Sequence, residues 1–189
     1  MMQAFVENLI EAFRTPRTSA RRMIALAPNL RDCLLMVVLA FAIQGLLSGL
    51  LSGPSAGGIA ARFAELGLQL ALFFLIVIGA HRIGARFGGK ATPEQIGPVV
   101  AWHYLVTSFL APLNVLGMRA VNPETGSAGI LFLLVPFSVG LSIWLLASFL
   151  AEAHGFQRLG PVIMATVAGF LGLGLITMIF LGIVSGAAR

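Results

Sequence analysis

Charged side chains are scarce in this 189-residue chain. Lys, Arg, Asp and Glu together make up 10% of it, whereas a soluble domain carries about 25%. Hydrophobic residues make up 58%, and the mean hydropathy is +0.97. A chain this apolar has too little polar surface to cover a water-soluble fold. The composition therefore excludes an ordinary soluble domain and predicts burial in a membrane.

Cysteine is nearly absent as well, because Cys33 is the only one. An intrachain disulfide and a cysteine metal cluster are therefore excluded. The seven acidic residues are scattered over loops and helix ends, and no serine stands with a histidine and an acid in a recognisable order. Glu152 and His154 could share a metal ion, but two ligands make a weak site. These absences predict a protein that is not an enzyme and that has no cofactor and no metal.

Long uncharged stretches fill most of the chain between residues 32 and 188. About 20 apolar residues in a helix cross the hydrocarbon core of a bilayer. The pattern predicts an all-α integral membrane protein, with a membrane domain over residues 32–189. Pro112 and Pro136 lie inside the third and fourth spans and are expected to kink or split them. The five predicted transmembrane helices cover residues 33–51, 66–83, 95–118, 129–151 and 159–185.

The segment 1–31 is more polar and is predicted to be cytoplasmic. Residues 3–14 place apolar side chains at helical spacing, with polar ones on the other face, which is typical of an amphipathic helix lying in the membrane interface. Pro16 is expected to end this helix. A second short helix is expected to run to about Leu26, with Thr18 or Ser19 as its cap.

Basic residues alternate between the two sides of the predicted spans. Nine lie before the first span, between the second and third, or between the fourth and fifth, and three lie on the other side. The positive-inside rule then places the amino terminus in the cytoplasm and the carboxyl terminus in the periplasm. Nucleic acid is excluded as a partner, because the basic residues lie beside apolar spans and form no continuous patch. The predominance of Arg over Lys, with abundant Ala and Gly, indicates a GC-rich bacterial genome and hence the bacterial inner membrane.

Six basic residues are candidates for contact with lipid headgroups or a partner. Three of them precede the first span, where a solvated linker is an equally good interpretation, and three lie between the second and third spans. They are Arg17, Arg21, Arg22, Arg82, Arg86 and Lys90.

Gly45, Gly49 and Gly53 repeat every four residues in the first span. Small residues at this interval allow another helix to approach closely. Packing between helices of one chain is the favoured interpretation, and homo-oligomerisation through the first span is the alternative.

Polar side chains at membrane depth are few, and His103 and Asn114 are the main candidates for an intramembrane polar site. A proton relay would need a carboxylate partner, and no Asp or Glu lies in a span core. Trp102, His103 and Tyr104 are therefore interpreted as markers of interfacial depth.

Three segments resemble the Ypt/Rab-interacting protein (YIP) family in its bacterial branch. Residues 8–17 resemble the interfacial helix of the family, which ends in a proline. Residues 87–92, followed by Gln95 and Pro112, resemble its glycine-rich loop and proline-bearing third span, and residues 151–156 resemble the loop before its last span. The resemblance implies a polytopic, non-enzymatic protein, without a small-GTPase partner in a bacterium.

The sequence thus predicts a membrane scaffold, organiser or accessory protein. The lipid bilayer is its expected partner, with a second membrane protein or a further copy of the chain as the next. The alternative is a small transporter or channel component that uses the proline-broken third and fourth spans, with His103 and Asn114 lining the path.

Overall fold

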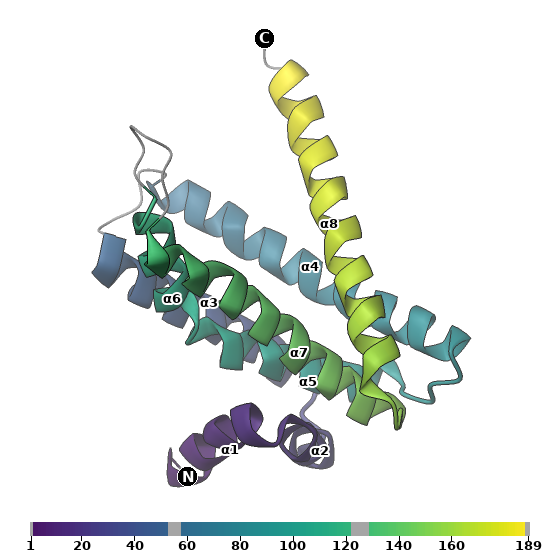
Figure 1. The fold of residues 1–189 in the computed structure, drawn as a ribbon. Helices are drawn as coiled ribbons and strands as arrows, with labels where there is room; N and C mark the ends of the chain where they lie inside the picture. Colours follow the sequence, from purple (N-terminus) through teal and green to yellow (C-terminus); the bar gives the residue numbers. More distant parts are fainter. Residues whose placement is uncertain (1, 53–57, 122–128, 188–189) are drawn as a thin grey trace.

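The computed structural model describes residues 2–52, 58–121 and 129–187, and its regular elements are all helices (Figure 1). Three segments are long and apolar enough to cross a membrane: α3, α4, and α7 together with the short 3-10 helix η1 before it. The bent pair α5–α6 makes a fourth. The elements are α1 (Met2–Arg14), α2 (Pro16–Leu26), α3 (Leu30–Ser52), α4 (Gly58–Arg86), α5 (Pro93–Ser108), α6 (Ala111–Arg119), η1 (Ile130–Leu133), α7 (Leu134–His154) and α8 (Leu159–Ala187).

The all-helical fold is confirmed, and the predicted helix positions agree with α3 to α8 within a few residues at most ends. The largest difference is α4, which is 29 residues long and begins well before residue 66. In α8 the described side chains end at Leu175, and the apolar stretch Leu159–Leu175 is shorter than a span. That the chain crosses the membrane five times therefore stays a prediction.

Helix α5 lies at the centre of the bundle and contacts α2, α3, α4 and α7. From Ile96 onward its side chains are buried or half-buried on all faces, with Ile96, Val99, Val100 and Val106 at 0% exposure. A helix that is apolar all round has no solvent face and is expected in such a position. In Figure 1, α8 leaves the bundle, packing on α7 near its beginning and then projecting away.

Reciprocal caps begin two of the long helices at the same end of the bundle. The Asp32 amide donates to Oδ1 of Asn29, and the Asn29 amide donates to Oδ2 of Asp32. The Thr92 amide likewise donates to Oε1 of Gln95 at the start of α5. These contacts satisfy amides that have no partner within the helix.

The third predicted span breaks between α5 and α6, which meet at 45°. Pro112 has no amide hydrogen for the carbonyl of Ser108, so the regular ladder cannot continue. Just before the break, the hydroxyl of Thr107 donates to the His103 carbonyl at 2.7 Å, and that of Ser108 donates to the Leu105 carbonyl at 2.7 Å. Such back-bonding bends helices. The prediction that Pro112 splits its span is confirmed.

Pro136 behaves differently, and the prediction that it kinks the interior of a helix is wrong. It is the third residue of α7, and the 3-10 turn η1 (Ile130–Leu133) lies before it. In the first turn of an α-helix the missing amide hydrogen has no intrahelical partner to lose. The chain accommodates Pro136 by changing helix type ahead of it.

Helices α1 and α2 form a layer against α5 and α7, seen below the bundle in Figure 1. We call these two helices the amino-terminal layer. Pro16 ends α1 as predicted, but Thr15 precedes the first turn of α2, so the expected cap at Thr18 or Ser19 is wrong. Ser19 is fully buried instead. Its hydroxyl donates to Oδ1 of Asn8 at 3.1 Å and accepts from Nε1 of Trp102 at 2.9 Å. This chain of contacts joins α1, α2 and α5.

We expect Ser19→Ala to destabilise the protein by about 1–3 kcal/mol, because it leaves the buried indole N–H of Trp102 without its acceptor. Thr18→Ala, at an exposed position one residue earlier, is the matched control and should cost less than about 0.5 kcal/mol. Thermal unfolding in detergent measures both. Equal changes in unfolding temperature for the two variants would contradict a stabilising role for the hydrogen bond between Ser19 and Trp102.

Candidate functional site

The end of α7 is joined to the loop between α4 and α5 through one buried histidine. Nε2 of His154 lies 3.2 Å from the carbonyl oxygen of Ala80, and the Ala91 amide donates to Nδ1 at 3.4 Å. The Ala91 carbonyl oxygen lies 3.0 Å from Nδ1 of His81. We call Ala80, Gly84, Gly89, Ala91 and His154 the His154 junction. It ties together segments more than 60 residues apart in the chain.

Two glycines make room for the imidazole ring. A Cβ on Gly84 would lie 2.2 Å from Cε1 of His154, and a Cβ on Gly89 would lie 2.4 Å from its Nδ1. Gly84 follows Ala80 by one helical turn, so its missing side chain opens the path to the Ala80 carbonyl. The ring can therefore bond to a helical carbonyl that a larger residue would cover.

The turn after α7 holds the other face of the ring. Gly155 ends the helix with φ 73°, a left-handed conformation that favours glycine. The Phe156 amide then bonds back to the Ala151 carbonyl at 2.8 Å. This turn places the Phe156 ring against His154, stacked at 5.3 Å between centroids and 25° between planes.

The partners of His154 fix its tautomer. An amide can only donate, so Nδ1 accepts from Ala91, and a carbonyl can only accept, so Nε2 carries the hydrogen that bonds Ala80. Both ring nitrogens are used on the backbone. Glu152, the other residue of the weak metal pair, binds Nε of Arg21 at 2.8 Å instead. The described residues hold no group of three or more potential metal ligands.

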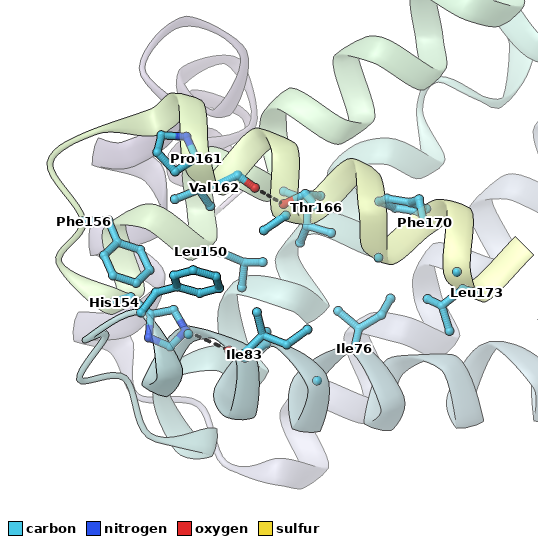
Figure 2. A pocket seen from close by; sticks show the side chains of 18 of the residues that line it. Ile76, Ile83, Leu150, His154, Phe156, Pro161, Val162, Thr166, Phe170 and Leu173 are labelled. Atoms are coloured by element: carbon cyan, nitrogen blue, oxygen red, sulfur yellow. Dashed lines mark hydrogen bonds between the residues drawn. The ribbon is translucent and has the colours of Figure 1, made fainter.

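A groove of about 620 Å³ opens beside the His154 junction, between α4, α7 and α8. Figure 2 shows its apolar body, with Ile76 and Ile83 on one side, Leu150 on the floor, and Phe170 on α8. Its polar end is formed by His154, Gln157 and Arg158. The groove exists because α8 contacts α7 and diverges from α4 (Figure 1).

The basic residues predicted to contact lipid divide into two groups. Arg17 donates to the Gln157 carbonyl at 3.3 Å, Arg21 pairs with Glu152, and Arg22 pairs with Glu11. These three therefore hold the amino-terminal layer on itself and on the end of α7. The other three, Arg82, Arg86 and Lys90, are exposed, and none has an acidic partner among the described residues.

The glycine stripe of the first span is described at two of its three positions. At Gly45 and Gly49 no described atom lies within 4 Å of the place a Cβ would take, and Gly53 lies outside the described residues. The described residues thus show no close helix approach at these two glycines, and their role in packing stays a prediction. The close approaches are at Gly84 and Gly89, and at Gly117, where a Cβ would lie 2.7 Å from Cγ2 of Val135.

His103 and Asn114 both face α7 across the broken span. The hydroxyl of Ser138 donates to Oδ1 of Asn114, and Ser142 lies 3.4 Å from Nε2 of His103. Ser138 and Ser142 are one turn apart, so the two predicted polar residues belong to one strip along α7. Nδ1 of His103 is buried and has no hydrogen-bond partner within the part of the chain that the structure describes.

The sequence indicates these residues but not their partners. It suggests His154 as a weak metal ligand and Ser19 as a helix cap. A signal for the His154 junction was present in the glycines at positions 84, 88 and 89, which precede α5. Their spacing indicates a close approach, but not which side chain makes it.

No family model, no curated protein and no solved structure matches this chain.

We expect Gly84→Ala to destabilise the protein by about 1–3 kcal/mol, because the new methyl group would overlap an imidazole that is held by two hydrogen bonds and a stacked ring. Gly67→Ala on the same helix is the control, since its Cβ would meet nothing within 4 Å. Thermal unfolding in detergent compares them. The role of the junction would be refuted if Gly84→Ala were no less stable than Gly67→Ala.

Proposed function

We propose that this protein is a non-enzymatic scaffold of the bacterial inner membrane, with five crossings and its basic end in the cytoplasm. The bilayer is its first partner. A partner membrane protein or a further copy of the chain is held at its cytoplasmic end or along its lipid-facing helices. Arg82, Arg86 and Lys90, together with the amino-terminal layer, make the contacts with anionic lipid.

The observation that carries this proposal is the construction of the amino-terminal layer. Its inner face packs on the bundle, with Ala12 fully buried and Phe5 edge-on to Trp102 at 5.8 Å. Its outer flank leaves Val6 and Ile10 exposed at 45% and 48%. An exposed apolar flank beside a basic segment suits the headgroup boundary of a membrane. A layer fixed at this depth anchors the protein on one membrane face.

The proposed orientation is supported by where the basic segments meet. Arg21 bonds to Glu152 near the end of α7, Arg17 bonds to the loop after it, and His154 bonds to the loop that carries Lys90. The segments that charge alone predicts on the cytoplasmic side therefore lie at the same end of the bundle. A common end is what the positive-inside rule requires of them.

The YIP-type assignment is part of this proposal and rests on the resemblance of three segments. Two of the three segments on which the resemblance rests, residues 87–92 and residues 151–156, meet at the His154 junction. The third, residues 8–17, contributes Asn8 and Arg17 to the amino-terminal layer. The resemblance thus involves positions that hold this fold together.

The layer is tested by measuring the depth of a spin label in the full-length protein in phosphatidylglycerol vesicles. In a Cys33→Ala background, we expect a label at Ile10→Cys to collide more with oxygen than with a water-soluble nickel chelate, because this flank lies in the interface. A label at Lys90→Cys, in the exposed loop, should show the reverse. Equal access of the nickel chelate to both labels would contradict a lipid-facing layer.

A transporter or channel component is the second candidate function, and one observation favours it. The buried and unpartnered Nδ1 of His103 lies on the polar strip beside the break between α5 and α6. Broken helices and intramembrane polar groups often border a pathway. Against it, no carboxylate accompanies His103 at this depth among the described residues.

Flux through proteoliposomes separates the two functions. The scaffold proposal predicts that proton and sodium flux stay at the level of protein-free vesicles for the wild type and for His103→Ala alike. Flux in the wild type that His103→Ala abolishes would establish the second function.

A further inference from the structure

We propose that the groove between α4, α7 and α8 is a binding site for one phospholipid with an anionic headgroup. An acyl chain would occupy the apolar body, and the phosphate would lie at the end marked by Arg158. The inference rests on the membrane location proposed above, but it does not depend on the amino-terminal layer.

The length of the groove corresponds to one leaflet. On one wall the lining runs from Leu75 in α4 to Phe87 just beyond its end, and on α8 it runs from Pro161 to Leu173. The stretch on α8 has twelve helical steps and is about 18 Å long at 1.5 Å per step. Half of a hydrocarbon core of about 30 Å is close to this length. A lipid from one leaflet therefore fits along the groove, whereas a spanning helix would extend well past it.

The volume agrees with a single small ligand. The groove encloses about 620 Å³, within the range of about 300–1,000 Å³ that is usual for small-molecule sites. A helix about 10 Å wide that crosses the whole core occupies more than about 2,000 Å³. The lining is apolar over most of its length, which matches an acyl chain rather than a polar solute.

The charge at the polar end matches a phosphate. Arg158 is exposed, and it stands immediately before the first turn of α8, where free backbone amides favour an anion. Arg82 precedes the lining residue Ile83 of α4, and Arg86 precedes Phe87, which lines the groove just beyond the end of this helix. None of the groove-lining residues is acidic, and Glu152 nearby is paired with Arg21.

Native mass spectrometry of the full-length protein tests the site. The protein is purified in mild detergent and titrated with palmitoyl-oleoyl phosphatidylglycerol or with phosphatidylcholine of the same chains. We expect one tightly held phosphatidylglycerol. Gly169→Leu should weaken its binding by about tenfold or more, because the new side chain fills the groove at a place with room for a Cβ. Gly79→Leu, on the opposite wall, is a second variant of the same kind.

Matched controls separate the site from general effects. Gly140→Leu adds the same side chain at an exposed helical glycine outside the groove and should leave binding unchanged. Arg158→Gln should reduce the preference for phosphatidylglycerol over phosphatidylcholine by about fivefold, and Arg119→Gln should not. Equal binding by the groove-filled variants and Gly140→Leu would overturn the proposal. So would a lipid-free dimer that Gly169→Leu disrupts, since it would assign the groove to a second copy.

This experiment fails independently of the spin-label measurement. If no lipid binds in the groove, the proposed depth of Ile10 is unaffected. If Ile10 proves to be exposed to water, the proposed lipid site in the groove is unaffected.

Discussion

Hydrocarbon offers no hydrogen bond to a peptide group, and this constraint accounts for most of the backbone conformation of the chain. The apolar segments are helical throughout the described residues, so their amides and carbonyls are satisfied within each segment. Where the helix must break, at Ser108 to Ala111, the hydroxyls of Thr107 and Ser108 bond carbonyls in the preceding turn. The irregular backbone at residues 27–29 and 87–92 lies at one end of the bundle, where caps and His154 satisfy part of it.

The same constraint explains why the His154 junction bonds to backbone groups. A loop between two membrane helices can be held by water alone, but here the Ala91 peptide is bonded on both sides, by His154 and His81. These contacts hold the end of α4 and the loop after it against the end of α7. The following turn sends α8 away from α4, and the lipid groove between them is the consequence. A structural contact at one end of the bundle thus shapes a site along its side.

Much of the fold could be predicted because length, hydropathy and proline act locally. The helix pattern and the break before Pro112 follow from residues that are close in sequence. The position of Pro136 in the first turn of α7 did not follow, because local sequence does not show that a 3-10 turn in contact with α6 stands before it. The partners of Arg21 and His154 lie 131 and more than 60 residues away in the chain. Periodicity in one segment carries no information on such pairings.

The glycines show the same division between local and tertiary information. The regular spacing of Gly45 and Gly49 is visible in the sequence, yet these residues meet open space. The less regular Gly84 and Gly89 surround an imidazole. The spacing of glycines in the sequence identifies a helix face without side chains. Only the tertiary structure shows which group packs against that face. For the candidate site, the sequence indicated the basic residues and the polar pair, but the groove depends on the divergence of two helices.

The central claim is that the basic segments share one membrane face, and labelling of single cysteines in intact cells tests it most directly. In a Cys33→Ala background, cysteines replace Lys90, Gln157 and Arg119 one at a time, and a membrane-impermeant maleimide is added before or after permeabilisation. The account predicts that positions 90 and 157 are labelled only after permeabilisation and that position 119 is labelled in intact cells. Labelling of positions 90 and 157 from opposite sides would contradict it.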